Sequence, residues 1–420
     1  MKPSRRELLA GAAALAAARP AAAQVAPRTP PMPIPAPPLD VAVVGAGVFG
    51  AWTAKKLQDA GKRVLLVDPW GPAHARASSG GESRMTRGAY GADEIYTRMA
   101  LSSLAEWQLL SRESGLPIFA PTGVLFFFPN RDPYALATID VHRRLGLSTE
   151  VLDRAQMARR FPAIDFSGVE IGLFEPQFGV LMARRAVQTL VARFVRAGGE
   201  YLAAQVLPPE PGQGRLTALR TADGQTITAD RFVFAAGPWL PRLFPDLLER
   251  RIRPTRQEVF FFRPPAGDSR FQPGRLPGWA DFNGGDLFYG MPDLEARGFK
   301  IARDTHGPAM DPDTGDRVHS AEALARVRAF MARRFPTLAD APLNESRVCQ
   351  YENSANGDFL IDRHPRWHNA VLVGAGSGHG FKMGPAVGAY AAALATGAPL
   401  TIEPRFSLAS KAESGERMVH

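Results

Sequence analysis

The sequence contains one cysteine, Cys349, in 420 residues. No disulfide can therefore form within the chain, even in an oxidising compartment. A lone cysteine is most often a small buried hydrophobic residue, and a catalytic or covalently modified thiol is the alternative.

Long basic runs and long apolar runs are also absent. The formal net charge is +9 and the pI is about 10, yet no five consecutive residues are basic, and aromatic residues do not alternate with the basic ones. We therefore expect no nucleic acid binding, and at most a mild attraction for anionic substrates. We also expect no stable membrane span. The content of 45% hydrophobic and 22% charged residues allows a globular body of two domains.

The first 38 residues have the composition of an export signal followed by a linker. Residues 1–23 carry the pair Arg5 and Arg6, a weakly apolar alanine-rich middle and a small-residue end. This pattern predicts a twin-arginine signal peptide, with a retained helix or anchor as the alternative. We expect a periplasmic or secreted protein that the twin-arginine machinery exports already folded. Residues 24–38 are rich in proline, which predicts a stiff extended linker.

A nucleotide-binding pattern follows the linker. Residues 41–68 read VAVV, GAGVFG, an amphipathic segment and VLLVD, which predicts strand, glycine turn, helix and strand. Gly45 suits the tight turn, Gly47 the approach of a pyrophosphate and Gly50 the packing of helix on strand. Asp68 ends the second strand, where an acid can bind an adenosine ribose. This acid disfavours NADP and leaves NAD and FAD open, and a glycine turn without a nucleotide is the alternative.

Two further stretches combine glycines with basic residues. Residues 77–87 read ASSGGESRMTR, and if they were helical, Arg84 and Arg87 would project in similar directions and could hold a carboxylate. A solvated basic loop fits the same composition equally well. Residues 370–394 predict a strand, the glycine loop GAGSGHGFK and a helix, a second place where bare amides could face a ligand. A helix start with a solvated Lys382 is the alternative there.

The rest of the chain predicts two domains. Residues 251–302 are rich in short β segments, which predicts a sheet-based second domain over the ligand. Lys300 lies there within GFKIA, where composition favours an outward-facing strand residue over a buried lysine with a destabilised charge. The tail after Phe406 is polar and expected to be disordered. Apolar periodicity predicts helices at residues 96–110, 153–160, 183–197 and 384–394, and strands at 123–129, 232–239 and 370–373.

Five segments together resemble one family: GESRMTRGAY, RPTRQ at residues 253–257, VCQYE around Cys349, FLIDRHP and SGHGFK. They are similar to the flavoprotein amine oxidases of the monomeric sarcosine oxidase group, which includes oxidases of N-methyltryptophan, pipecolate and fructosyl amino acids. The resemblance runs from Leu39 to about Pro404 and selects FAD over NAD. It implies an α/β fold with a Rossmann-like FAD-binding domain at 39–114, 181–247 and 347–404, an antiparallel-sheet substrate domain at 115–180 and 248–346, and a polar tail at 405–420.

The resemblance also implies roles for single residues. Cys349 resembles the cysteine that forms a thioether to the 8α-carbon of the flavin, and Lys300 resembles the lysine that activates oxygen. Arg87 and Lys382 resemble the pair that holds the substrate carboxylate. Arg84 and Tyr289 resemble active-site residues beside the flavin and the substrate. The implied cofactor-binding residues are Gly45, Gly47, Val48, Phe49, Gly50, Asp68, Ser78, Ser83, Arg84, Val206, Ala236, Gly237, Trp239, Cys349, Gly376, Gly378, His379, Gly380 and Lys382; no metal is implied.

Two positions depart from the family pattern. Asp304 stands where sarcosine oxidase has an active-site histidine four residues after the lysine, although His306 is close in sequence. Gly80 replaces a histidine of the flavin loop. Sarcosine itself is therefore a doubtful substrate, and an acid at position 304 with room at position 80 would suit a larger or more cationic amine substituent.

The implied activity is oxidation of a secondary amino acid that is N-methylated, N-substituted or cyclic. FAD would take a hydride equivalent from the carbon bearing the amine, the imine would hydrolyse, and O2 would be reduced to H2O2. We expect a monomer whose partners are a small amine substrate and O2. A dehydrogenase that passes electrons to a quinone or carrier, and a flavin-binding protein without catalysis, are the alternatives.

Overall fold

The computed structural model describes residues 38–283, 286–305 and 307–413. The expected signal peptide, the linker up to residue 37, His306 and residues 414–420 lie outside the described residues. Within the part of the chain that is described, the strands form three sheets, of seven, eight and three strands.

The first sheet is built around β1 (Leu39–Val44), which contains the strand expected at residues 41–44. All four of those residues are buried, as is typical of a central strand covered on both faces. β1 pairs in parallel with β2 (Val64–Val67) and with β11 (Thr226–Phe234), and β11 pairs in parallel with β18 (Ala370–Gly374). The order is β17 (Leu360–Arg363), β18, β11, β1, β2, β9 (Glu200–Leu202), with β10 (Ala218–Arg220) beside β11.

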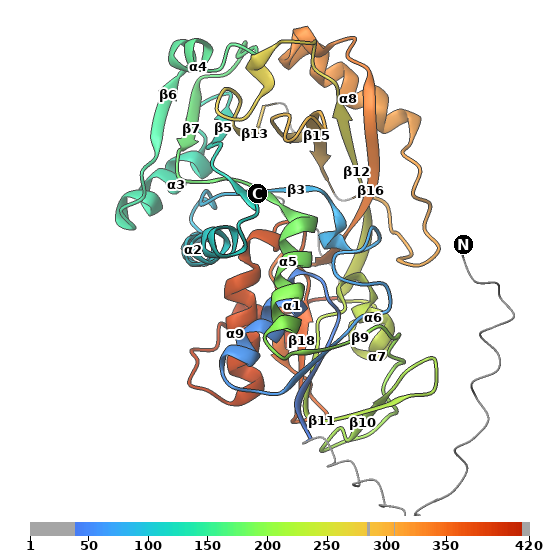
Figure 1. The fold of residues 1–420 in the computed structure, drawn as a ribbon. Coiled ribbons are helices and arrows are strands. Elements are labelled where there is room, and N and C mark those ends of the chain that lie inside the picture. Colours follow the sequence, from blue (N-terminus) through green and yellow to red (C-terminus); the bar gives the residue numbers. More distant parts are fainter. Residues whose placement is uncertain (1–37, 284–285, 306, 414–420) are drawn as a thin grey trace, which may run out of the picture. The chain divides into compact units, whose positions relative to one another are not determined.

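Helices α1, α5 and α9 pack beside one another next to this sheet (Figure 1). α1 (Val48–Asp59) begins directly after Gly47, as the glycine pattern predicts. α9 (Gly384–Thr396) approaches α1 so closely that a Cβ at Gly388 would lie 2.6 Å from the backbone of Trp52. α5 (Ala183–Arg196) contacts α1, and α2 (Glu94–Ser114) contacts α9. The expected helices at residues 96–110, 183–197 and 384–394 are confirmed.

The second sheet is mostly antiparallel, and helix α8 (Ala321–Arg334) covers it. Its core is aromatic: the ring of Trp279 stacks with that of Phe330 at 5.9 Å and with that of Phe299 at 5.9 Å. The β-rich texture of residues 251–302 is thus confirmed. The order is β16 (Leu343–Ser354), β12 (Ile252–Phe262), β15 (Phe299–Asp304), β14 (Leu287–Met291), β13 (Gly278–Asp281), β5 (Val124–Phe128), β7 (Ile171–Glu175) and β6 (Glu150–Asp153).

The remaining elements lie between and around the two sheets. The third sheet joins β3 (Ser83–Thr86), β8 (Gly179–Met182) and β4 (Phe119–Ala120). The other helices are α3 (Pro133–Arg144), α4 (Arg154–Arg160), α6 (Leu240–Leu243) and α7 (Pro245–Leu248), and the short 3-10 turns are η1 (Ser78–Gly80), η2 (Gly237–Trp239), η3 (Ser269–Phe271), η4 (Pro336–Leu338), η5 (Phe381–Met383), η6 (Pro404–Phe406) and η7 (Leu408–Ser410).

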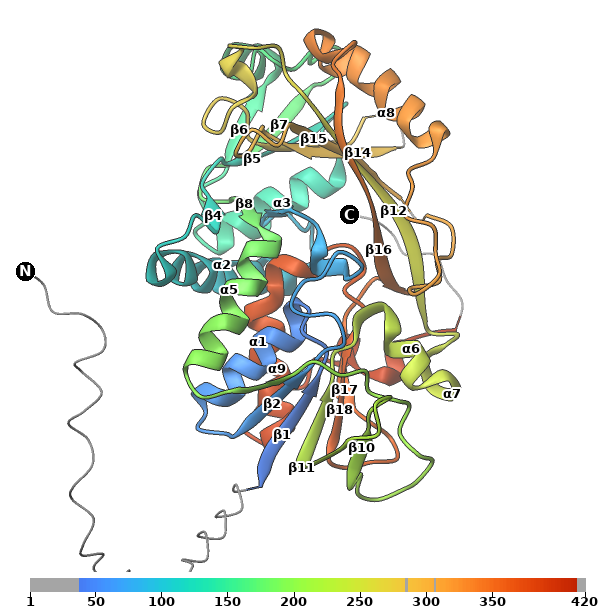
Figure 2. The same cartoon turned by 45° about the vertical axis from the view of Figure 1, so that its right-hand side comes forward.

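Strands β12 and β16 connect the two sheets. They pair from Ile252 opposite Ser354 to Phe262 opposite Leu343, and Figure 2 shows them running from the second sheet towards the first. The boundary expected at residue 347 therefore falls inside β16. Since the described residues form one compact unit, the division into two domains stays a prediction.

The expectation of a disordered tail after Phe406 is wrong for residues 407–413. η7 forms there, and Leu408 donates its backbone N–H to Asp362 Oδ2 at 2.8 Å. Lys411 is fully buried, and its Nζ donates to the Arg405 carbonyl at 2.6 Å. A polar composition did not reveal these partners because they are distant in sequence or belong to the backbone.

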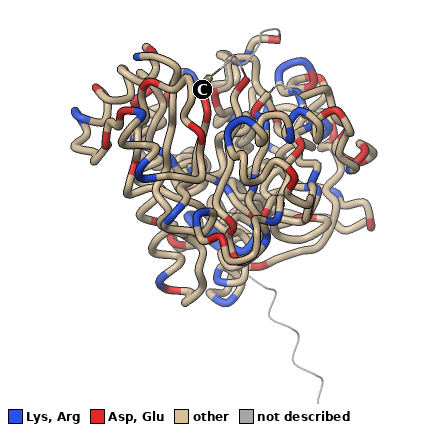
Figure 3. The backbone as a smooth tube through the Cα atoms, turned by 90° about the horizontal axis from the view of Figure 1, so that it is seen from above, with Lys and Arg blue, Asp and Glu red and all other residues tan. Residues whose placement is uncertain are grey.

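Among the described residues, no helix is both long enough and apolar enough to cross a membrane. Figure 3 shows lysine and arginine interspersed with aspartate and glutamate along the chain. Many of these charges are paired, as in Arg185 with Glu295 at 2.7 Å and Arg334 with the buried Asp281 at 2.7 Å.

Candidate active site

Three adjoining cavities lead from the carboxyl ends of the first sheet to the space beneath the second sheet. The first cavity shares Gly47, Ser78, Ala235 and Gly237 with the second. The second shares Arg84, Tyr351, Gly378 and Phe381 with the third. Ligands of open α/β sheets bind at the carboxyl ends of the strands, so this row of cavities is the candidate site.

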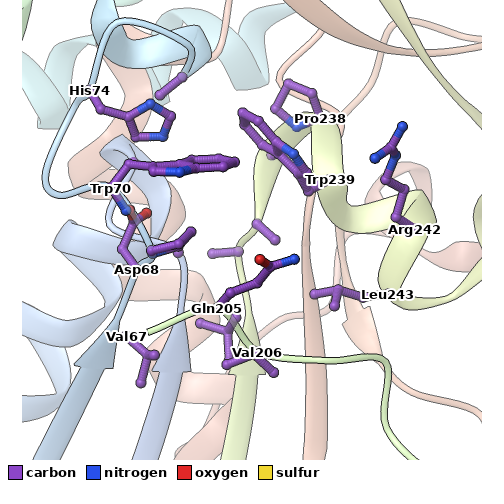
Figure 4. Close-up of a pocket in the computed structure, with 18 of the residues that line it drawn as sticks. Val67, Asp68, Trp70, His74, Gln205, Val206, Pro238, Trp239, Arg242 and Leu243 are labelled. Atoms are coloured by element: carbon purple, nitrogen blue, oxygen red, sulfur yellow. The ribbon is translucent and has the colours of Figure 1, made fainter. Parts of the chain in front are cut away.

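The first cavity opens where β1, β2 and β11 end. Figure 4 shows Trp70 and Trp239 close to each other in the upper part of it, with Asp68, Gln205 and Val206 below them. The two indole rings lie 4.9 Å apart. Of the predicted cofactor-binding residues, this cavity is lined by Gly45, Gly47, Asp68, Ser78, Val206, Ala236, Gly237 and Trp239.

Glycine is required at two positions of the first motif. Gly45 has a φ of +105°, and a Cβ there would lie 2.3 Å from the carbonyl oxygen of Ala235. A Cβ at Gly50 would lie 1.8 Å from the carbonyl oxygen of Gly45. At Gly47, by contrast, a Cβ would meet only Ser79 Oγ at 3.5 Å, so the space above this glycine is open to a ligand. This is the arrangement that a dinucleotide phosphate needs at a helix start.

Asp68 joins two loops at the edge of the first cavity. Its Oδ2 accepts from the Ala46 N–H at 2.9 Å, and its Oδ1 accepts from the N–H groups of Trp70 and Gly71 at 2.9 and 3.0 Å. Each carboxylate oxygen can accept more than one hydrogen bond. Asp68 can therefore hold the two loops and still accept a hydrogen bond from a ribose hydroxyl. The contact with a ribose stays a prediction.

The second cavity lies between the glycine turn and the glycine loop before α9. Predicted residues Gly47, Val48, Phe49, Ser78, Arg84, Gly376, Gly378 and Gly380 line it, together with Tyr351 and Glu352. A Cβ at Gly378 would lie 2.6 Å from the ring of Tyr351, so the loop and strand β16 pack closely here. Together, the first and second cavities form a continuous cradle that runs from the glycine turn at Gly47 to Arg84 and Phe381, and this lining fits FAD.

The third cavity is lined by both candidate arginines. Arg84 and Arg87 lie on or next to strand β3, so the stretch is not helical, yet the two side chains reach the same cavity. Lys382 lies in η5, before rather than in the first turn of α9. The lining residues are Arg84, Met85, Arg87, Phe126, Ala280, Phe282, Leu287, Tyr289, Met291, Asp304, Tyr351, Gly378, His379, Phe381 and Lys382.

Tyr90 contacts both of the cations predicted to hold a carboxylate. The Arg87 guanidinium lies 4.0 Å from the centre of the Tyr90 ring. Lys382 Nζ donates to Tyr90 Oη at 2.8 Å and to the His379 carbonyl at 2.7 Å. Burial would lower the pKa of Arg87, but Tyr90 and Tyr134 outweigh it and raise the pKa, so Arg87 stays charged. Sequence reasoning missed Tyr90, whose only signal was its place in GESRMTRGAY.

Lys300 is buried, so the outward-facing reading of the composition is wrong. Its side chain is 2% exposed, and Nζ donates to the Ser83 carbonyl at 2.6 Å and to Ser83 Oγ at 3.2 Å. β15 pairs on both sides, with β12 and β14, which makes it an interior strand. Burial and the nearby charge of Arg84 hold the pKa of Lys300 well below its usual value.

Arg84 and Cys349 lie side by side. Arg84 donates to the carbonyls of Ser78 and Ser83 at 2.7 and 3.0 Å. Burial would lower the pKa of Arg84, but its electrostatic interactions with Cys349, Tyr289 and Tyr351 raise it overall. Cys349 is 7% exposed and packs with Phe261.

Tyr289 and Asp304 lie together on β14 and β15 at the wall of the third cavity. Burial and the Asp304 carboxylate raise the pKa of Tyr289 to about 12, so its hydroxyl is neutral and can donate. Gly80, in contrast, leaves no room: a Cβ there would lie 2.1 Å from the His74 carbonyl oxygen. The expectation of room for a substrate group at position 80 is therefore wrong, because the backbone of His74 fills that space.

A buried acid lies near Arg87 and Lys382. Glu175 is fully buried; its Oε1 accepts from the Gly88 N–H at 2.9 Å and lies 3.7 Å from His142 Nε2. Burial raises the pKa of Glu175 to about 8, although the Gly88 N–H and Arg87 oppose the shift. Glu175 therefore carries a proton at neutral pH.

Replacing Glu175 by glutamine is expected to make stability less dependent on pH. The native pKa lies above the unfolded value near 4.5, so the native state keeps a proton that the unfolded state loses. Wild-type stability should fall as the pH rises from about 5 to 8, by up to about 1.4 kcal/mol per pH unit from this group. Glu175→Gln should remove this pH-dependent loss of stability. The free energy of unfolding of the variant relative to that of the wild type should therefore rise from pH 5 to pH 8.

Urea unfolding at pH 5, 6.5 and 8 would measure the effect. Glu170→Gln, at an exposed position, is the control and should track the wild type. A difference between Glu175→Gln and wild type that does not change with pH would contradict the prediction.

Comparisons with known proteins agree with this geometry. Residues 40–394 match the family described as DAO, FAD dependent oxidoreductase. The chain is 31% identical to the monomeric sarcosine oxidase of Bacillus sp. (strain B-0618), over 85% of this chain and 92% of that protein. It is 29% identical to the N-methyl-L-tryptophan oxidase of Citrobacter koseri, over 85% of this chain and 95% of that protein.

The fold also matches a solved structure, that of L-proline dehydrogenase from P. horikoshii. The TM-score is 0.76 at 20% identity, and the match covers 88% of this chain and 97% of that one. The glycine turn, the row of cavities and the family match lead to one conclusion: the chain belongs to the DAO family and is an FAD-dependent oxidoreductase.

Proposed function

We propose that this enzyme oxidises the carbon–nitrogen bond of a secondary amino acid, N-methyl, N-substituted or cyclic, and that O2 reoxidises it with formation of H2O2. The observation that carries the proposal is the pair Arg87 and Lys382, which share Tyr90 at one cavity. Two fixed cations there suit a carboxylate. Two of the proteins named above are oxidases of N-methylated amino acids, sarcosine and N-methyl-L-tryptophan, which supports the same class.

FAD, when bound, accepts the electron pair from the substrate carbon, and the protein binds and orients the amine. Arg87 and Lys382 would hold the substrate carboxylate, which fixes the position of the neighbouring carbon. The aromatic rings of Phe126, Phe282 and Phe381 line the same cavity and would exclude water. The positive charges disfavour an ammonium ion, so the amine would bind in its neutral, reactive form.

Asp304 gives the proposal its finer substrate class. Its carboxylate and the Tyr289 hydroxyl lie together at the cavity wall, where the two cations also project. An acid in such a cavity favours a substrate with a second, positively charged or hydrogen-bond-donating group. We therefore propose an amine substituent that is larger or more cationic than the methyl group of sarcosine.

Cys349 is proposed to bind the flavin covalently through a thioether. Its burial beside Arg84, which lines both inner cavities, supports this assignment. The neighbouring buried Lys300 supports oxygen as the acceptor, and an acceptor such as a quinone is the less favoured alternative. Export by the twin-arginine route to the periplasm or beyond is proposed from the N-terminal pattern, and a monomer from the family likeness.

Acid precipitation of the purified protein tests the cofactor assignment, with Cys349→Ala alongside. Yellow colour that stays with the wild-type peptide and leaves the variant would establish a thioether-linked flavin. A peroxide-coupled screen of N-methyl, N-alkyl and cyclic amino acids, including lysine and arginine derivatives, then tests the substrate class. Activity that requires the substrate carboxylate is expected; flavin reduction without peroxide would favour the dehydrogenase alternative.

Replacing Tyr90 by phenylalanine is expected to raise the KM for the best amine of that screen about tenfold, with a smaller change in kcat. The variant keeps the ring beside Arg87 and removes only the oxygen that accepts from Lys382, a hydrogen bond to a charged group. Steady-state kinetics would measure it. Tyr96→Phe is the matched control, because its hydroxyl donates to Asp358 at 2.6 Å instead. Equal effects in both variants would contradict the role of Tyr90.

A further inference from the structure

Glu352 is a buried carboxyl group in the second cavity for which the proposed reaction provides no role. It lies on β16 and is 5% exposed. The same cavity is lined at one end by the phosphate-binding turn at Gly47 and at the other by Arg84 and Phe381. Of the three cavities, Glu352 lines only the second, which adjoins the other two.

The two carboxyl oxygens of Glu352 have different surroundings. Oε1 accepts from the Gly376 N–H at 3.2 Å. Oε2 is buried and has no hydrogen-bond partner among the residues that the structure describes. Burial raises the pKa of Glu352 to about 7, although the backbone amides of Gly376 and Ala375 oppose the shift. A buried polar group without a partner is costly, and in native proteins it commonly marks the place of a bound group.

The chemistry of FAD indicates which part of the cofactor would reach Glu352. A chain of hydroxyl-bearing carbons joins the diphosphate to the flavin ring. If the diphosphate binds at Gly47 and the ring beside Arg84, this chain would cross the second cavity, which Glu352 also lines. Hydroxyl groups can both donate to a carboxyl oxygen and accept from a carboxylic acid, so they suit the group in either protonation state.

We propose that Glu352 is a cofactor-binding residue whose carboxyl group forms a hydrogen bond with the hydroxyl-bearing chain of FAD. The inference rests on the site proposed above for FAD. With this contact, Glu352 would distinguish FAD from ligands that contain only the ADP half of FAD.

Titration of the Cys349→Ala apoprotein with FAD and with ADP tests the proposal, because ADP lacks the hydroxyl-bearing chain. Binding of FAD is followed by quenching of flavin fluorescence, and binding of ADP by calorimetry. Glu352→Leu, in the same background, should raise the Kd for FAD about fivefold to tenfold and leave the Kd for ADP unchanged. Glu352→Gln keeps both hydrogen-bonding positions and should change either Kd less than threefold.

Two controls separate binding from folding. Glu175→Gln alters another buried acid and should change neither Kd. Glu352→Ala replaces the leucine variant if that one does not fold. Equal weakening of FAD and ADP would assign Glu352 to the support of the Gly376 loop and overturn the proposal, as would an unchanged Kd for FAD. If the Cys349→Ala parent binds ADP but not FAD, the proposed FAD site itself fails.

Discussion

Replacing Lys300 by methionine is expected to slow the reaction of the reduced enzyme with O2 by about 100- to 1,000-fold. The first electron transfer to O2 creates an anion, and a fixed positive charge in a site without water stabilises it by several kcal/mol. Methionine keeps most of the volume but carries no charge. Stopped-flow mixing of amine-reduced enzyme with oxygenated buffer would measure the rate, separately from reduction by the amine, which should change far less.

The pH dependence of the same rate follows from the lowered pKa of Lys300. The ammonium is present below that pKa and is lost as the pH rises through it, at a pH well below 10.5. Reoxidation of the wild type should therefore slow as the pH rises, and Lys300→Met should lack this part of the profile. Lys411→Met is the control, since Lys411 is also fully buried but is held by the Arg405 carbonyl. If Lys300→Met is reoxidised by O2 at the wild-type rate, the role of Lys300 in the reaction with oxygen is refuted.

Replacing Arg87 by methionine is expected to raise the KM for the carboxylate-bearing substrate by about 100-fold or more. A bidentate bond between guanidinium and carboxylate in a buried site contributes about 2–3 kcal/mol beyond a neutral contact. Arg87→Lys keeps the charge and loses the planar fork, so its KM should lie between wild type and Arg87→Met. Steady-state kinetics under saturating oxygen would give the values.

A substrate without the carboxylate makes the test of Arg87 specific. For the corresponding decarboxylated amine, wild type and Arg87→Met should differ less than threefold in kcat/KM. If Arg87→Met lowers kcat/KM for both compounds by the same factor, Arg87 supports the cavity wall through Tyr90 and Tyr134 and does not bind the carboxylate.

Local sequence patterns predicted the first sheet and its turn well. The motif at residues 41–68 is complete within one stretch, because strand, glycine turn and helix are adjacent in the chain. The same holds for the glycine loop before α9. Gly50 could be assigned because the backbone that it meets, the Gly45 carbonyl, lies within the motif. Gly45 could be assigned from the tight turn, whose φ of +105° favours glycine, although the nearest backbone to it belongs to Ala235 on a distant segment.

The inner part of the site could not be predicted in this way. Lys300 is buried because β15 lies between two partner strands and because Ser83, 217 residues away, provides its acceptors. Tyr90 meets Lys382 across 292 residues, and Glu352 meets Gly376 through the fold. Composition near Lys300 favoured the opposite orientation. Only the family resemblance pointed to its role, and it did not single out Tyr90 or Glu352.

The continuous strand β16 has a consequence for redesign of substrate preference. Tyr351 lines the second and third cavities, Glu352 lines the second, and Cys349 lies two residues before Tyr351. If the second cavity holds the flavin and the third the amine, as we propose, a change on this strand that reshapes the third cavity would also move cofactor contacts. Substitutions intended to accept new amines should be placed on β13 and β14, at Ala280 or Leu287, which line only the third of the three cavities. Libraries of variants with substitutions on β16 should yield mainly enzymes that bind the cofactor more weakly.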